Sequence, residues 1–266
     1  ENVGDDVHLR GLIEFSNYCR RNCYYCGLRA SNSKLRRYRI LPEEILEIAE
    51  QAVKLGYRTL VLQSGEDIFY TGEMIEELIR EIKRRYQVAI TLCIGEREEE
   101  DYWRWYEAGA DRYLLKFESS DPALYKRLHP DLFYEDRFRI LRLLKRIGYQ
   151  TGSGIIVGLP GQTYKSLADD LLLFQELDLD MIGLGPYIPH PETPGYQLFQ
   201  DQANRIVPAN EEMTYRMIAL SRILCPEAMI PATTALATVN LAWGRELALK
   251  RGANVCLLYT SDAADE

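Results

Sequence analysis

Short apolar runs alternate with longer amphipathic stretches along nearly the whole chain. A short run bounded by turn residues is typical of a buried strand, whereas apolar positions recurring every three or four residues are typical of a helix. The short runs predict strands at residues 11–15, 59–62, 88–94, 111–117, 151–159, 181–188 and 229–233. The amphipathic stretches predict helices at residues 42–55, 71–86, 98–108, 134–147, 164–177, 210–224 and 241–251.

The ends of these helices carry local signals. Pro42 suits the first helical position, because proline lacks the amide hydrogen that this position leaves unpaired. Thr71 is a candidate N-cap for the second helix. Several helices are expected to end where a glycine follows the periodic stretch, at Gly56, Gly109, Gly148 and Gly252.

Strand and helix alternate about seven times with short loops. Such alternation predicts parallel strands joined by right-handed crossovers. With this many repeats, a parallel β/α barrel of the TIM type is the leading α/β architecture. A doubly wound sheet is the alternative, but its glycine fingerprint is missing, because Gly152-Ser153-Gly154 falls within a predicted strand.

The pattern changes abruptly near the C-terminus. After Cys256 the residues 257–266 look like translated adapter read-through, so we expect a non-native tail there. We therefore predict one barrel domain over residues 1–256. We expect it to be C-terminally truncated, with a further strand and helix in the natural chain.

Composition narrows the class of protein. The chain has 266 residues, of which 47% are hydrophobic, and this suffices for one large core. A net charge of −8 argues against a nucleic-acid or anionic-membrane surface. We find no signal peptide and no run of about 18 apolar residues. The six cysteines form no disulfide framework, so a reduced cytoplasmic location is expected.

Three cysteines follow the first predicted strand with the spacing C-x3-C-x2-C: Cys19, Cys23 and Cys26. Three thiolates this close together can hold three corners of a 4Fe–4S cube and leave the fourth iron open to a small molecule. A structural zinc site would need a fourth ligand, and neither His8 nor Cys93 has a suitable spacing. A C-x-x-C redox pair would leave Cys19 unexplained, and coincidence is the remaining alternative.

Basic residues are concentrated around these cysteines although the chain is acidic overall. They are Arg20, Arg21, Arg29, Lys34, Arg36, Arg37 and Arg39. Such runs are usually solvated faces, but beside this motif a role in anion binding or partner docking is the alternative hypothesis.

A C-x3-C-x-aromatic-C motif after a first strand resembles the radical S-adenosylmethionine (SAM) enzymes. The resemblance implies that a 4Fe–4S cluster chelates SAM through its amine and carboxylate. One electron from the cluster then breaks a carbon–sulfur bond and yields a 5′-deoxyadenosyl radical. Cys19, Cys23 and Cys26 would be the cluster ligands and the catalytic residues, and Tyr25 matches the aromatic that lies against the adenine.

The resemblance also assigns SAM contacts at the ends of the predicted strands. The segment Gln63–Asp67 is similar to the family's Gly-Gly-Glu motif, which holds the SAM amine, with Ser64 in place of the first glycine before Gly65 and Glu66. Its alternative is an ordinary turn. Glu118 matches the acid that holds the ribose hydroxyls, although Phe117 stands where relatives often have histidine. A helix-capping cluster is the alternative there.

Further contacts follow from the same resemblance. Arg137 matches the arginine that pairs with the SAM carboxylate, and a guanidinium can make a two-pronged contact with such a group. An exposed helical arginine is the alternative. Val157 and Leu159 resemble the edge of the strand that packs against adenine, and plain barrel core is the other interpretation.

Substrate contacts are less well marked. Thr233 and Thr234 place two hydroxyl groups after the seventh predicted strand, which suits a carboxylate or a similar anion. Thr91 and Arg112, on the third and fourth strands, could face the same cavity. His190 lies in a proline-rich loop and is expected to be structural rather than a ligand.

Longer phrases narrow the resemblance to the FeFe-hydrogenase maturases of the HydE family. They lie at residues 13–23, 61–67, 157–163, 185–191 and 230–235. The biotin synthase and methylornithine synthase relatives match these phrases less well. The resemblance implies an iron–carbonyl–cyanide–cysteine substrate, HydG and HydF as maturase partners, and a reductant such as ferredoxin or flavodoxin. Two hypotheses remain beside it: another radical SAM enzyme such as a methylornithine-synthase-like mutase, and a non-catalytic Fe–S or zinc carrier.

Overall fold

The computed structural model describes residue 4 and residues 6–200 and 206–259. The strands are β1 (His8–Ser16), β2 (Thr59–Ser64), β3 (Ala89–Cys93), β4 (Arg112–Leu114), β5 (Gln150–Val157), β6 (Met181–Pro186), β7 (Pro231–Ala232) and β8 (Val255–Tyr259). The helices are α1 (Pro42–Lys54), α2 (Gly72–Arg85), α3 (Glu99–Ala108), α4 (Pro122–Leu128), α5 (Tyr134–Ile147), α6 (Tyr164–Glu176), α7 (Pro194–Gln200), α8 (Glu211–Leu224), α9 (Thr234–Val239) and α10 (Gly244–Leu249).

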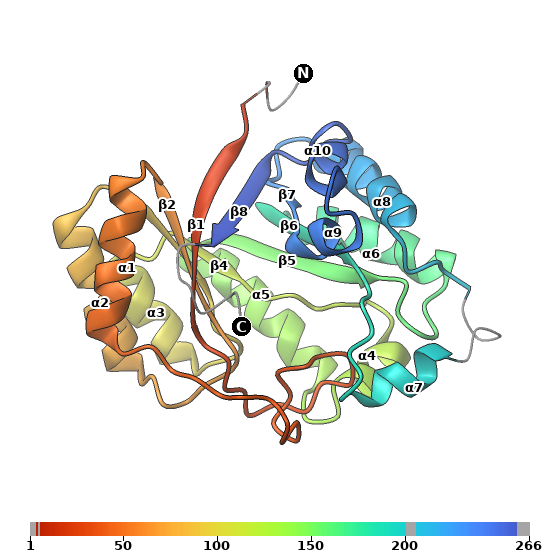
Figure 1. Ribbon diagram of the computed structural model, residues 1–266, viewed down its shortest axis with the longest axis horizontal. Coiled ribbons are helices and arrows are strands. Elements are labelled where there is room, and N and C mark those ends of the chain that lie inside the picture. Colours follow the sequence, from red (N-terminus) through yellow and green to blue (C-terminus); the bar gives the residue numbers. More distant parts are fainter. Residues whose placement is uncertain (1–3, 5, 201–205, 260–266) are drawn as a thin grey trace.

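The eight described strands form one sheet in the order β6-β5-β4-β3-β2-β1-β8-β7. Every pairing is parallel. A parallel bridge between Met181 and Met229, just before β7, brings the two ends of the sheet together. The sheet is therefore a nearly closed β/α barrel with helices outside it, and the TIM-type prediction is confirmed (Figure 1).

Alternation along each strand separates the core from the barrel interior. In β1, Ile13 and Phe15 are fully buried in the main hydrophobic cluster, which also contains residues of the surrounding helices. Glu14, between them, lines a cavity instead. Because successive strand side chains point to opposite faces, the even-numbered positions of β1 face the inside of the barrel. The main apolar core thus lies between sheet and helices.

The predicted helix ends are largely confirmed. Pro42 opens α1, and the Thr71 side chain caps α2 by accepting a hydrogen bond from the Met74 amide. Gly109 and Gly148 end α3 and α5 in the left-handed conformation that glycine adopts without a steric cost. Within the described residues, every helix is too short or too polar to cross a bilayer.

Four elements were not expected from the pattern: α4, α7, α9 and β8. The three helices have only six or seven residues, too few to show a clear helical period. Asp121 caps α4 by accepting from the amides of Ala123 and Leu124, which is the capping role considered for this segment.

Strand β8 includes residues that the sequence analysis left outside the fold. Leu257, Leu258 and Tyr259 pair with Arg10, Gly11 and Leu12 of β1. They fill the edge between β1 and β7, which would otherwise expose unpaired backbone groups. Residues 260–266 lie outside the described residues, and the non-native origin of the stretch 257–266 stays a prediction.

Candidate active site

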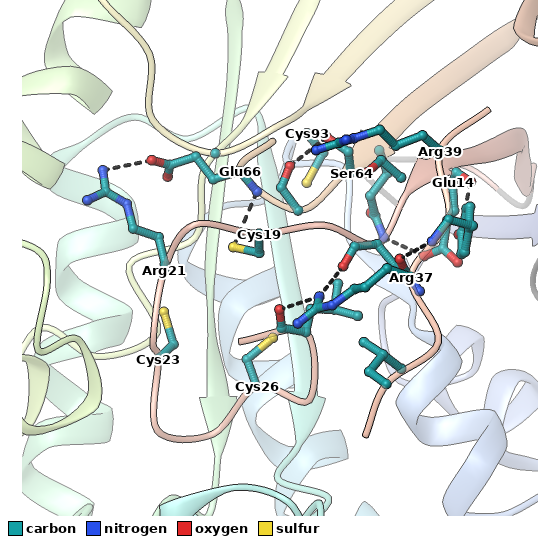
Figure 2. A pocket seen from close by; sticks show the side chains of 18 of the residues that line it. Glu14, Cys19, Arg21, Cys23, Cys26, Arg37, Arg39, Ser64, Glu66 and Cys93 are labelled. Carbon is teal, nitrogen blue, oxygen red and sulfur yellow. Dashed lines mark hydrogen bonds and ion pairs between the residues drawn. The ribbon is translucent and has the colours of Figure 1, made fainter. Parts of the chain in front are cut away.

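A cavity of about 1380 Å³ lies at the carboxyl ends of β1–β4. Its walls come from the loop after β1, the ends of β2, β3 and β4, and Arg137 of α5. In a parallel barrel this end collects ligands, because the strand-to-helix loops converge there. Figure 2 shows that the loop carrying the cysteines curves around one side of this space.

Cys19, Cys23 and Cys26 all lie in this loop and all line the cavity as free thiols (Figure 2). The Cys19 sulfur accepts a hydrogen bond from the Glu66 amide at 3.4 Å. Among the described residues, no three His, Cys, Asp or Glu side chains converge on a point that could hold one metal ion. A single zinc ion needs every thiolate sulfur within about 2.3 Å of one point, whereas each iron of a cube takes its own thiolate.

The thiols of Cys23 and Cys26 lie in surroundings that disfavour their charged form. Burial, reinforced by the neighbouring thiolates of Cys26 and Cys19, raises the pKa of Cys23 to about 12. Burial likewise raises the pKa of Cys26 to about 11. Cysteines in such a setting stay protonated near neutral pH, and a bound metal displaces the proton. Three thiols that share one cavity and lose their protons to solvent when the sulfurs bind iron are the donor set that a 4Fe–4S cluster uses.

Glu66 holds the cysteine loop in place. One of its carboxylate oxygens lies 2.6 Å from Arg20 Nε and 2.7 Å from Arg21 Nη2, and the other accepts the Glu96 amide at 2.9 Å. Both carboxylate oxygens of Glu66 therefore bind groups of the protein itself, and Glu66 anchors the cysteine loop.

Gly65 lies where the β2 end touches the cysteine loop. A side chain at this position would bring a Cβ within 2.1 Å of the Tyr18 carbonyl oxygen. Only glycine fits such a close approach of two backbones. Ser64, beside it, donates from Oγ to the Gly65 carbonyl at 2.6 Å. Both residues line the cavity, Gly65 through its backbone and Ser64 through its backbone and hydroxyl group.

Arg137 is buried at the cavity wall. Its Nε lies 2.6 Å from Glu96 Oε1, and its Nη1 donates to the Lys116 carbonyl. The exposed fraction of the whole residue is 6%, so the alternative of a solvent-exposed helical arginine is excluded. A guanidinium fixed by two partners has little freedom left, and it is preorganised for a ligand in the cavity.

Glu118 lies in an unusual backbone conformation. Its φ is +63°, in the left-handed region that residues with a side chain seldom occupy. The conformation is held by its amide, which donates to Gly154 O at 3.0 Å, and by Ser120, whose amide donates to Asp170 Oδ1 at 2.6 Å. Lys116 Nζ lies 3.0 Å from the Glu118 carboxylate. Such strained residues are concentrated at functional sites.

The structure brings most of the expected SAM contacts together. Those that line the cavity beside the cysteines are Tyr25, Ser64, Gly65, Glu66, Glu118 and Arg137. Val157 is fully buried in the core cluster that includes the helices. Leu159 lies in a small neighbouring hollow, which Tyr25 also lines. These two apolar residues are therefore placed behind the cavity wall.

The expected substrate contacts do not line the cavity. Arg112 starts β4 and bonds Gln150 and Thr59, which start their own strands, so it lies at the opposite end of the barrel. Thr91 is buried, with its hydroxyl unpartnered among the described residues. Thr233 donates to the Leu184 carbonyl at 3.0 Å, and Thr234 begins α9.

Other polar residues line the cavity that sequence reasoning missed: Glu14, Gln63, Cys93 and Lys116. Gln63 Nε2 donates to Glu14 Oε1 at 2.6 Å, and burial raises the pKa of the Glu14 carboxyl. Strand alternation could have found Glu14, Cys93 and Lys116, because each lies between two apolar residues on a predicted strand, whereas Gln63 directly follows its predicted strand.

Part of the basic stretch is structural. Arg37 donates to the carbonyls of Asn17, Leu28 and Arg29, so it ties both ends of the cysteine loop together. Arg39 makes a two-pronged contact with Asp67 at 2.7 and 2.9 Å. These arginines hold the loop itself, whereas Arg20 and Lys34 are exposed at its edge.

The chain is similar in sequence and in fold to proteins that are already known. A sequence model of the radical SAM superfamily matches residues 13–174. The FeFe-hydrogenase maturase subunit HydE of Thermotoga maritima is 51% identical over 255 residues, which cover 96% of this chain and 70% of that protein. The crystal structure of methylornithine synthase (PylB) is similar with a TM-score of 0.87 at 25% identity, over 98% of this chain and 74% of that one.

A third similarity concerns the fold alone. The crystal structure of HydG, a maturase of the FeFe-hydrogenase, superposes with a TM-score of 0.78 at 20% identity. The match covers 96% of this chain and 57% of that one.

Proposed function

Because the chain belongs to the radical SAM superfamily, and within it to the HydE family of maturases, we propose that it directs a SAM-derived radical at a sulfur-containing iron synthon. Enzymes of this superfamily use a 4Fe–4S cluster and SAM. When bound, these groups supply one electron and a 5′-deoxyadenosyl radical. The proposal rests on one observation above all: the three cysteines, Arg137 and Glu118 line a single cavity.

The residues around the cysteines would orient SAM. Arg137 would pair with the carboxylate, since its guanidinium is fixed at the wall by Glu96. Glu118 would accept hydrogen bonds from the ribose hydroxyls. Tyr25, between Cys23 and Cys26, would lie against the adenine, with the apolar side chain of Leu159 behind it.

The backbone around Gly65 would receive the SAM amine. Ser64 and Gly65 line the cavity at the end of β2, and the Gly65 backbone lies directly against Tyr18 and Cys19. Glu66 would act indirectly, because its carboxylate binds the two arginines of the cysteine loop.

The substrate would lie beyond SAM, among the inward-facing polar residues. Glu14, Gln63, Cys93 and Lys116 combine an acid, an amide, a thiol and an ammonium group in one part of the cavity. A substrate that carries both amine and carboxylate groups, as a cysteine-bearing iron complex does, suits this set. Thr91, Arg112, Thr233 and Thr234 stay candidates only for contacts made deeper in the barrel.

Partners and location follow from the family. We propose that HydG supplies the synthon, that HydF receives the product, and that a ferredoxin or flavodoxin in the cytoplasm supplies the electron. Arg20 and Lys34 are exposed beside the cysteine loop, and although each pairs with a carboxylate of this chain, Glu66 and Glu192, both would remain accessible to an acidic donor. The proposed barrel domain, expected over residues 1–256 and extended by residues 257–259 of β8, would carry all these steps.

Anaerobic reconstitution with iron and sulfide tests the proposal. With SAM and dithionite, the protein is expected to release 5′-deoxyadenosine. Added to an FeFe-hydrogenase maturation mixture that lacks HydE, it is expected to restore active hydrogenase. No 5′-deoxyadenosine would exclude a radical SAM activity and favour a plain Fe–S or zinc carrier.

Methylornithine synthase is the second candidate, because its crystal structure superposes over 98% of this chain. That enzyme class and the maturases share the barrel, so the fold does not separate them. Rearrangement of lysine by the reconstituted protein, without any effect on hydrogenase maturation, would favour the second candidate.

A further inference from the structure

His129 is a buried polar residue that the proposed chemistry does not use. It directly follows α4, and its exposed fraction is 1%. Buried imidazoles need hydrogen-bond partners for both ring nitrogens. Both partners are present, and one of them belongs to the cysteine loop.

The two contacts fix the proton on the ring. Nδ1 lies 3.1 Å from the Tyr125 carbonyl oxygen, which can only accept a hydrogen bond, so Nδ1 carries the proton. Nε2 then has a free lone pair, and it lies 3.1 Å from the Tyr25 hydroxyl. The Tyr25 hydroxyl therefore donates to His129 Nε2. Burial, together with the charge of Arg137, lowers the pKa of His129 to about 3, so the ring stays neutral in ordinary buffers.

The rings also pack against each other. Tyr25 and His129 meet edge to face, with centroids 5.5 Å apart, and Tyr125 covers the other side of His129 at 4.2 Å. Tyr25 lies between two cluster ligands in the sequence and lines both the large cavity and the small hollow behind it. Tyr25 also interacts with the Cys23 side chain, so the hydrogen bond to His129 is one of two polar contacts that orient the Tyr25 ring in the cavity wall.

We propose that His129 is a positioning residue, which holds the Tyr25 ring against the adenine of SAM through one hydrogen bond. The inference rests on the proposed SAM site. The loop does not depend on His129 for its attachment, since the Tyr24 amide also donates to the Leu128 carbonyl at 2.9 Å. Removing the imidazole is therefore expected to loosen the Tyr25 ring while the cysteines keep their cluster.

The test compares SAM dissociation constants of reconstituted variants. His129→Leu and Tyr25→Phe each remove the hydrogen bond and are expected to weaken SAM binding about five- to tenfold, with full iron content. The double variant is expected to bind no more weakly than either single variant, because both remove the same contact. His129→Gln, which can still accept from Tyr25, is expected to recover binding to within about twofold of wild type.

Tyr125→Phe is the matched control. It removes a hydroxyl from the other tyrosine packed on His129, and that hydroxyl has no hydrogen-bond partner among the described residues. It is expected to bind SAM as wild type does. Additive losses in the double variant, or wild-type binding by His129→Leu, would overturn the inference. If His129→Leu fails to fold, the single variants carry the test: Tyr25→Phe is expected to lose binding, whereas His129→Gln, which keeps the acceptor, is expected to retain it, and equal losses in the two would overturn the inference.

A second readout does not need the cluster. The chain has three histidines, so the ring nitrogens of ¹⁵N-histidine-labelled, cluster-free protein can be assigned by substitution. We expect one neutral ring with the proton on Nδ1, unchanged down to about pH 4, whose Nε2 signal shifts in Tyr25→Phe. An Nε2-protonated ring would overturn the inference. If the NMR result holds but wild-type protein binds no SAM, the proposed function fails instead.

Discussion

The two sides of the barrel interior differ in what they present to the cavity. On β1–β3 and just after β4, several polar or charged residues line the cavity: Glu14, Gln63, Cys93 and Lys116. On β5 and β6 the positions that alternate with core residues are mostly glycines: Gly152, Gly154, Gly183 and Gly185. The first side therefore carries functional groups, whereas the second carries almost none.

The glycine side leaves these inward positions without side chains. A Cβ added at Gly183 would meet Lys116 first, at 3.7 Å, so this glycine faces the polar side across the interior. At Gly154 a Cβ would lie 2.0 Å from the Gly183 carbonyl oxygen, so that glycine is needed for the close approach of β5 and β6. The two sides thus differ in that polar groups line the cavity on one side, whereas the other side has few side chains and closely packed strands. Each of the following changes tests one part of this difference.

The largest effect is expected at the cysteines. Cys23→Ala removes one of three thiolates, and we expect loss of the cluster and of all SAM cleavage. Iron and sulfide analysis with detection of 5′-deoxyadenosine measures both. Cys225→Ala, a thiol remote from the cavity at the end of α8, is the control and is expected to keep its iron. Retained turnover in Cys23→Ala would contradict the assignment.

A large effect on stability at all pH values is expected on the glycine side. Gly154→Ala places a methyl group against backbone that cannot move aside, and we expect the free energy of unfolding to fall by about 3 kcal/mol. Gly183→Ala meets nothing closer than 3.7 Å, and we expect a change below about 1 kcal/mol. Urea unfolding of the two variants compares them directly. Equal losses would show that the two glycines do not have separate roles.

Asp170 links the two sides, and its effect depends on pH. It lies on α6, outside β5, and holds Ser120 beside Glu118. Burial, with smaller contributions from Asp169 and Asp121, raises the pKa of Asp170 to about 7. The folded state therefore holds a proton that the unfolded state releases near pH 4, so this contribution to stability is complete below about pH 4 and is lost as pH rises to about 7.

Asp170→Asn removes that titration while keeping an oxygen for the Ser120 amide. Relative to wild type, the variant is expected to gain stability between pH 4 and pH 7 by up to about 4 kcal/mol. Unfolding curves in urea at several pH values measure the difference. A difference that stays constant across this range would contradict the assigned pKa.

The smallest of these effects is expected at Arg137. Arg137→Lys keeps the positive charge near Glu96 but loses the two-pronged guanidinium, and we expect about tenfold weaker SAM binding. Arg139→Lys, an exposed change on the same helix, is the control and is expected to leave binding unchanged. Calorimetry under anaerobic conditions measures both, and equal affinities in the two variants would reject Arg137 as the carboxylate partner.

Most of the barrel could be predicted from the sequence because strand and helix alternate with clear stops. The spacing of the three cysteines and the position of Tyr25 between two of them also allowed the cluster ligands to be predicted from the sequence. The role of Glu66 could not be foreseen, because its arginine partners become neighbours only when the loop folds back on β2. Arg112 was expected in the cavity. It is the first residue of the short strand β4 and lies at the end of the barrel away from the cavity, so its side chain does not reach the site.

His129 shows a different limit. It follows a seven-residue helix that the pattern did not reveal, and it meets Tyr25 across 104 positions of the chain. No local signal distinguishes it from the other histidines. The buried hydrogen bond to a tyrosine between two cysteines becomes visible only in three dimensions.

The central claim is that three cysteines hold a cluster whose remaining iron faces SAM on the polar side of the barrel. Electron paramagnetic resonance of the reconstituted, dithionite-reduced protein tests it most directly, with and without SAM. We predict about four irons per chain and a cluster spectrum that changes when SAM is added. A four-iron cluster whose spectrum ignores saturating SAM would contradict the claim.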